Sequence, residues 1–170
     1  MSRFDPRCFG PAVCDFYFTV PSDYDHDTQL DTFAKNTKPL ATTHHFDGYL
    51  NGKNFAKVTT MLEPGKKYRV RMFPVVEVAT TGDCLGFLEE KNAVLVTAQG
   101  ITLLQSHHPD KFPIFKWVVS FDERDYLWEC VKNPQRATLV HHRPNNEWEF
   151  RLANFGFSWC NHLLLCFSEK

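Results

Sequence analysis

The chain has 170 residues, of which 43% are hydrophobic and 23% are charged, proportions typical of a folded globular protein. A chain of this length buries roughly 70% of its unfolded surface, so it needs no disulfide bonds to hold a core. Its nineteen basic and twenty acidic residues give a net charge of −1, which disfavours proteins that hold nucleic acid through its phosphates.

The first elements are short and lie in a polar stretch broken by prolines at positions 6, 11, 21 and 39. Residues 15–20, Asp-Phe-Tyr-Phe-Thr-Val, are typical of a short strand. Asp27 is placed to cap a brief helix through Leu30 and Phe33 that ends near Asn36.

A hairpin is predicted next, over residues 44–61, because Asn51-Gly52 is a preferred pair for a type I′ turn. A second turn at Pro64-Gly65 leads into a strand over residues 67–76. There the apolar side chains Tyr68, Val70 and Met72 alternate with the basic side chains Lys67, Arg69 and Arg71. This period of two predicts a strand that is buried on one face and basic on the other.

The middle of the chain alternates between helical and extended patterns. Asp83 is placed to cap a helix that stops near Asn92. Residues 93–96, Ala-Val-Leu-Val, predict a short buried strand. Residues 98–108 fit either a helix or a strand, and Pro109 ends the segment in both cases.

Strands dominate the last third of the chain. Residues 115–121 predict a strand, and Ser120 with Glu123 forms a capping box that predicts a helix over residues 122–130. Three further strands are predicted over residues 136–143, 147–153 and 159–167. In the middle one of these, Trp148, Phe150 and Leu152 are expected to face inward, and Glu147, Glu149 and Arg151 outward.

These elements predict an α+β fold. We expect a mixed, mostly antiparallel sheet, with two or three helices packed on one face and a C-terminal β-meander. We expect a single domain over residues 1–170, with a loosely structured N-terminal extension over residues 1–42 as an alternative for that stretch.

The chain also carries features that bear on its compartment. It has no run of eighteen apolar residues, and its first residues lack the apolar core of a signal peptide. We therefore expect a cytoplasmic protein without a membrane segment, whose six cysteines are reduced.

The histidines raise the question of a metal site, because six of the eight occur as adjacent pairs, His44-His45, His107-His108 and His141-His142. Neighbours on a strand point to opposite faces, so only one member of each pair can reach a given site. Cys160 and His162, two residues apart on a predicted strand, share a face and are the better metal chelate. Half-buried histidines at strand ends are the alternative interpretation, and no cofactor is predicted.

A second candidate site is the hexapeptide Gly82-Asp-Cys-Leu-Gly-Phe87. It places Cys84 in the first turn of a predicted helix, where the free N–H groups favour a reactive thiolate. The hexapeptide resembles the Asp-Cys-Ser-Gly-Phe/Leu helix start of NlpC/P60-type cysteine peptidases. The resemblance implies a cysteine hydrolase with Cys84 as nucleophile, His142 or the adjacent His141 as base, and Asn154 as the residue that orients the base.

The chain departs from that family in two places. The serine after the cysteine is replaced by Leu85, and the turn at Asn145-Asn146 comes too early for His142 to pair with Asn154. The alternative is that Cys84 is a small buried hydrophobic residue.

A third candidate is the basic strand face of Lys67, Arg69 and Arg71, which suits a phosphate or a single strand of nucleic acid. A solvated strand face is the alternative, and we expect no nucleic-acid partner. No phosphate-binding glycine loop, Gly-x-Ser-x-Gly elbow or calcium loop is present. The sequence favours a small binding or interaction protein with a protein or small-molecule partner. A cysteine hydrolase and a metal-binding protein are the alternatives.

Overall fold

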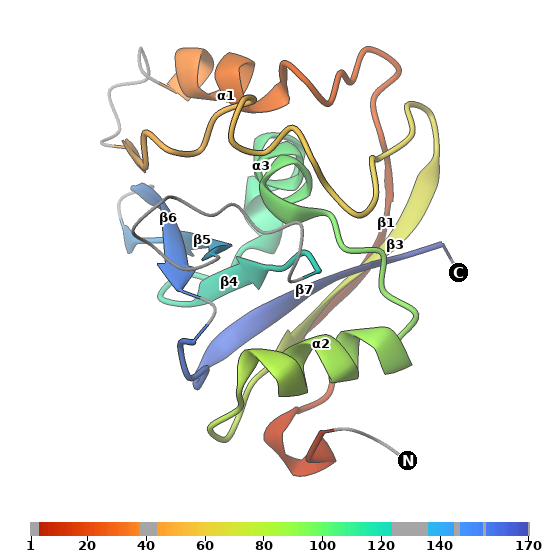
Figure 1. Ribbon diagram of the computed structural model, residues 1–170, viewed down its shortest axis with the longest axis vertical. Coiled ribbons are helices and arrows are strands. Elements are labelled where there is room, and N and C mark those ends of the chain that lie inside the picture. Colours follow the sequence, from red (N-terminus) through yellow and green to blue (C-terminus); the bar gives the residue numbers. More distant parts are fainter. Residues whose placement is uncertain (1–3, 38–43, 124–135, 145–146, 155, 170) are drawn as a thin grey trace.

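The computed structural model describes residues 4–37, 44–123, 136–144, 147–154 and 156–169 (Figure 1). Seven strands in these segments form one sheet, in the order β1-β3-β7-β4-β5-β6-β2. They are β1 Cys14–Thr19, β2 His44–Phe46, β3 Lys67–Pro74, β4 Trp117–Ser120, β5 Arg136–His142, β6 Trp148–Asn154 and β7 His162–Ser168. Neighbouring strands are antiparallel except for β4 with β7 and β2 with β6, which run parallel.

Three α-helices in the described segments cover both faces of this sheet. They are α1 Gln29–Thr37, α2 Thr81–Glu90 and α3 Thr97–His107, and two 3-10 turns, η1 Pro6–Cys8 and η2 Pro109–Lys111, accompany them. Helices α1 and α3 lie on one side of the sheet and α2 on the other (Figure 1).

The alternation of side chains along β3 shows how the sheet supplies two cores. Val70 and Met72 point into the core beneath α1 and α3, where they join Ile101. Phe73, the next residue, points to the opposite face and joins Leu88 of α2. Burying a side chain of this size contributes roughly 1.5–3 kcal/mol, so both layers of helices are held by apolar contact with the same strands.

The predicted fold class is confirmed. The sheet is mixed and mostly antiparallel, and two helices, α1 and α3, share one face. The run β4-β5-β6 is antiparallel, after which β7 crosses to the middle of the sheet and pairs with β3 and β4. Helix α2 covers the other face of the sheet, on which no helix was predicted.

The prediction of a hairpin over residues 44–61 is wrong. Only β2 is extended there, and it pairs with the distant strand β6. The chain then runs through turns that bury Leu50 and Phe55 in the core under α1 and α3. Gly52 is buried in these turns, and a Cβ on it would lie 2.5 Å from the backbone oxygen of Asp27. The glycine therefore permits a close approach of two chain segments.

Two ambiguous segments of the sequence are resolved. Residues 98–107 belong to helix α3, and His108 is its C-cap. Residues 93–96 are not a strand as predicted, since Val94 forms only an isolated bridge with Phe167. The helix predicted over residues 122–130 lies outside the described residues, apart from its first two positions.

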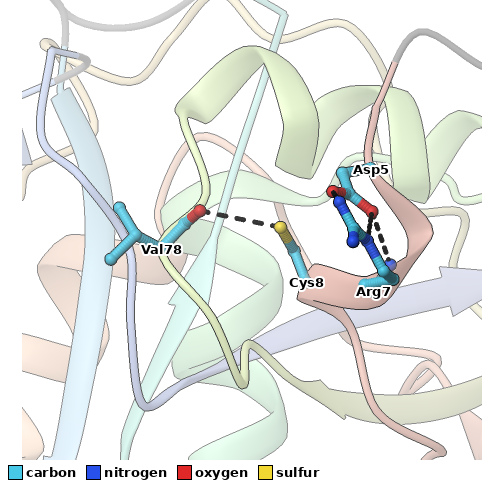
Figure 2. A network of polar contacts seen from close by, with 4 residues as sticks. All are labelled: Asp5, Arg7, Cys8 and Val78. Carbon is cyan, nitrogen blue, oxygen red and sulfur yellow. Dashed lines mark hydrogen bonds and ion pairs between the residues drawn. The ribbon is translucent and has the colours of Figure 1, made fainter.

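The N-terminal turn η1 is tied to the rest of the chain. The Asp5 carboxylate accepts a hydrogen bond from the backbone N of Arg7 at 2.9 Å and forms an ion pair with its guanidinium at 2.6 Å (Figure 2). The guanidinium lowers the pKa of Asp5 to about 2. Cys8 Sγ donates to the carbonyl oxygen of Val78 at 3.6 Å, which joins the turn to the segment before α2.

Candidate ligand-binding groove

Cys84 lies in the first turn of α2, as expected, but it is fully buried against the sheet. The N-cap of α2 is Thr80 and not the predicted Asp83, which lies at the third helical position and completes a capping box with Thr80. Burial raises the pKa of the Cys84 thiol, and the Asp83 carboxylate raises it further. A buried, protonated thiol is poorly suited to nucleophilic attack.

The structure does not bring Cys84, His142 and Asn154 together. The His142 ring stacks on Trp148 at 4.0 Å, and its Nδ1 lies 3.1 Å from the carbonyl oxygen of Phe112. Trp148 and Phe112 belong to the core under α1 and α3, whereas Cys84 belongs to the core under α2. Asn154 is at the other end of β6 from Trp148, roughly 20 Å away along the strand.

The three basic residues of β3 have different surroundings. Lys67 is exposed, and its Nζ lies 4.6 Å from the centre of the Tyr17 ring. Arg69 forms two hydrogen bonds with Asp15, at 2.8 and 2.6 Å. Arg71 is half-buried and donates a hydrogen bond at 3.2 Å to the carbonyl oxygen of Lys91, the first residue after α2. Two of the three cations are thus already engaged, which weakens the case for a phosphate site on this strand.

The contact between Cys160 and His162 joins the histidine ring to the backbone of Cys160, and not to its thiol. The predicted strand begins too early, because β7 starts at His162 and Asn161 has a φ of 60°. His162 Nδ1 lies 2.7 Å from the carbonyl oxygen of Cys160, and burial lowers the pKa of this histidine. Within the described part of the chain, no three His, Cys, Asp or Glu side chains converge as a metal ion requires.

Glu149 is a buried residue that the sequence pattern predicted to face solvent. Its side chain is only 2% exposed, and it forms an ion pair with Arg143 and a longer one, at 3.5 Å, with Arg151. Its Oε2 lies 4.0 Å from Nδ1 of His141, whose ring stacks on Trp117 at 4.5 Å. The prediction was wrong because it assumed that only one face of the sheet was covered.

A groove of 510 Å³ lies between α1 and α3, within the usual range of about 300–1,000 Å³ for small-molecule sites. Its polar lining includes Asp23, Asp25, Thr32, Asn36, Gln105 and His107, and its apolar lining includes Tyr24, Phe33 and Leu103. The loop before α1 and the facing surfaces of the two helices supply these side chains.

Gln105 is the most informative of them. Its side chain is only 7% exposed and lines the groove, yet it has no side-chain hydrogen bond among the described residues. The neighbouring Ser106 hydroxyl, by contrast, donates to the carbonyl oxygen of Leu103 at 2.9 Å. The amide atoms of Gln105 are not among the fully buried polar atoms that lack a partner in the described residues. They are therefore open to the groove, where a polar ligand can form hydrogen bonds with them.

A chain of hydrogen bonds leads from the interior to Tyr24 on the groove wall. The Gln99 amide nitrogen donates to the carbonyl oxygen of Phe55 at 2.8 Å and lies 3.3 Å from Nε2 of His26. Because an amide nitrogen only donates, Nε2 of His26 accepts, and the proton of the neutral ring is on Nδ1. That nitrogen lies 3.3 Å from the Tyr24 oxygen and donates to it.

This direction of donation leaves the Tyr24 hydroxyl hydrogen without an acceptor among the described residues. Burial, and then the charge of Asp25, raise the pKa of Tyr24. The hydroxyl therefore stays protonated and is a hydrogen-bond donor.

The charge of the groove limits what it can hold. Asp23 and Asp25 are the acidic residues of the lining, and no Lys or Arg lines it in the described part of the chain. Asp25 already accepts hydrogen bonds from the backbone N of Asp27 and the hydroxyl of Thr28. An anionic ligand would meet repulsion without a compensating cation.

Sequence reasoning missed this groove. Gln105 lies in the segment that fitted a helix or a strand equally well, so its face was undefined. Tyr24 and His26 belong to a loop without a periodic pattern. The available signal was a polar residue that directly follows the apolar pair Leu103-Leu104. Its use required knowing that α3 is a helix packed on α1.

Comparison with protein-family models, curated proteins and solved structures gave no match to this chain. None of the described helices is long and apolar enough to cross a membrane.

Proposed function

We propose that the protein is a binding module that holds an uncharged, hydroxyl-rich small molecule in the groove between α1 and α3. The observation that carries the proposal is the amide of Gln105, which is open to the groove and has no hydrogen-bond partner among the described residues. A binding site commonly combines apolar walls with a few polar groups of this kind.

Hydroxyl groups fit this lining because each both donates and accepts a hydrogen bond. The Gln105 amide offers two donor hydrogens and an acceptor oxygen, Tyr24 offers a donor, and Asp23 offers acceptors. The rings of Tyr24 and Phe33 supply apolar surface for the carbon skeleton of a sugar or polyol. The acidic lining disfavours phosphorylated and carboxylated relatives of such a ligand.

Isothermal titration calorimetry with a panel of neutral monosaccharides and polyols tests the proposal. At least one member should bind, and its phosphate ester should bind about tenfold more weakly or worse, because of charge repulsion at Asp23 and Asp25. The proposal fails if no neutral member binds, or if the phosphate esters bind as tightly.

Two substitutions locate the site. Gln105→Met keeps the side-chain length and removes the amide, so ligand affinity should fall about fivefold. The free energy of unfolding should stay about equal, because the amide has no hydrogen-bond partner to lose among the described residues. Tyr24→Phe removes the donor and should weaken binding by a similar factor. A loss of stability that parallels the loss of affinity would instead indicate that Gln105 is a structural residue.

The alternatives have less support. The burial of Cys84 and its separation from His142 argue against a cysteine hydrolase, and the backbone contact of His162 supplies no second metal ligand. We also propose that the protein has no nucleic-acid partner, because its net charge is near zero. We propose a cytoplasmic location, where cysteines are expected to stay reduced.

A further inference from the structure

A second cavity, which shares no lining residue with the groove, lies at one end of the sheet. It has a volume of 320 Å³ and is lined mainly by apolar side chains where β3 ends and where β7 and β4 begin. Val75 and Leu163 are buried in its wall, and Pro74 and Pro113 complete it. We refer to it as the sheet-end pocket.

Large apolar side chains remain exposed around the sheet-end pocket. Val76, 51% exposed, and Val13 line the pocket itself. Phe115 is 70% exposed, and with Ile114 it connects the lining residues Pro113 and Lys116. Clustered exposed apolar side chains around a pocket are typical of a surface that contacts another protein.

The backbone around the pocket is held in an unusual conformation. Phe115 has a φ of 67° and is fixed by a hydrogen bond from its N to the carbonyl oxygen of His142 at 2.9 Å. Asn161 has a φ of 60°, and its N donates to the carbonyl oxygen of Val75 at 2.8 Å. A bulky aromatic residue rarely adopts positive φ, and such residues concentrate at functional sites. Here the strain presents an aromatic ring to solvent beside the pocket.

The described lining of the sheet-end pocket carries a positive charge and no negative charge. Lys116 is exposed and has no ion pair among the described residues, and no acidic residue lines the pocket there. A ligand that occupies the pocket therefore meets an unpaired cation at the rim.

We propose that the sheet-end pocket docks a peptide segment of a partner protein, which inserts one apolar side chain and places a carboxylate beside Lys116. The pocket is large enough for one such side chain. The exposed lining residues Val13 and Val76, with Phe115 beside the pocket, provide contact for the flanking residues. A peptide fits better than an anionic membrane, because a membrane surface is held by several clustered cations. Among the described residues, Lys116 alone supplies a Lys or Arg charge to the lining.

Fluorescence polarisation with labelled hexapeptides tests this proposal. The probe is Gly-Ser-Glu-Phe-Glu-Ser, compared with a version in which Phe is replaced by Ser and one in which both Glu are replaced by Lys. The first peptide should bind about tenfold more tightly than either of the others. Equal binding of all three, or binding of none, would overturn the proposal.

Variants at the rim give a sharper test. Lys116→Glu should reverse the preference, so that the lysine peptide binds more tightly than the glutamate peptide, while Lys53→Glu, at an exposed site outside the pocket, should leave it unchanged. Val76→Asp should abolish binding, and Val78→Asp, at a position that is 68% exposed but outside the pocket lining, should not. These residues are exposed, so the variants should fold.

Two further measurements on the same variants test for two other occupants of the sheet-end pocket. Sedimentation that showed a dimer broken by Val76→Asp would assign the pocket to a second copy of the chain. Co-sedimentation with phosphatidylserine vesicles that was lost in Lys116→Glu would assign it to a membrane surface. Either outcome, without selective peptide binding, would contradict the proposal.

Discussion

Arg143 neutralises Glu149, a carboxylate buried in the sheet. The Arg143 side chain is itself well exposed, and Arg151, on the same strand as Glu149, makes a second and longer contact at 3.5 Å. The two arginines thus share one buried carboxylate oxygen, but at unequal distances. Their substitution should have unequal effects on stability.

Arg143→Met should lower the free energy of unfolding by about 2–3 kcal/mol, because it leaves a buried carboxylate without its close partner. Arg151→Met is the matched control and should cost less than about 1 kcal/mol, since the longer contact is at the protein surface. Urea denaturation followed by circular dichroism measures both. Equal losses would contradict the prediction that Glu149 depends more on Arg143 than on Arg151.

Two half-buried histidines, His162 and His141, predict how stability depends on pH. Burial lowers the pKa of His162, and burial also lowers that of His141 against the opposing charge of Glu149. The unfolded chain, in which histidine has a pKa of about 6.5, therefore binds these protons first as the pH falls. Stability is fully present above that pKa and should be lost as the pH falls below it, by up to about 1.4 kcal/mol per pH unit for each histidine.

Urea denaturation at about pH 7.5 and about pH 5.5 checks this dependence on the histidine pKa. His162→Gln should reduce the difference in unfolding free energy between the two conditions, whatever its effect on stability at either one. Asp122, whose pKa burial raises, contributes the opposite slope and does so equally in both proteins. An unchanged difference in the variant would contradict the assignment to His162.

Cysteine accessibility should follow burial. Cys14 and Cys160 are partly exposed, whereas Cys8, Cys84 and Cys166 are buried. Iodoacetamide should therefore label the first two in the native protein and the other three only after urea is added. Mass spectrometry of tryptic peptides distinguishes the sites. Rapid native labelling of Cys84 would restore the cysteine hydrolase as a candidate.

Two glycines should respond differently to the same substitution. Gly52→Ala places a Cβ 2.5 Å from the backbone oxygen of Asp27 and should cost about 1–3 kcal/mol, because backbone must move. Gly48→Ala meets nothing within 4 Å and should be neutral or stabilise by up to about 1 kcal/mol. Thermal unfolding of the two variants checks the contrast. A similar melting temperature for both would show that the turn around Gly52 adapts.

The sequence predicted those elements whose pattern is local. The alternation along β3 and the apolar residues of β6 identified strands, because a period of two is set by strand geometry alone. The hairpin around Asn51-Gly52 failed for the opposite reason. Its turn signal was local, but the partner of β2 is β6, about one hundred residues later.

The candidate sites depended even more on distant contacts. Glu149 appeared exposed because the pattern of one strand does not reveal that a second face is covered. Gln105 and Tyr24 come from segments about eighty residues apart, which only the packing of α1 on α3 unites. Cys84 was correctly placed in a helix, yet its burial came from the sheet behind it.

The position of β7 has a consequence for how the chain acquires its shape during synthesis. This strand is the last in chain order, yet it joins the pair β1-β3 to the group β4-β5-β6-β2. Until β7 leaves the ribosome the two groups have no common neighbour, and each exposes an unpaired backbone edge that invites aggregation. Nascent chains halted before β7 should therefore be strong clients of molecular chaperones.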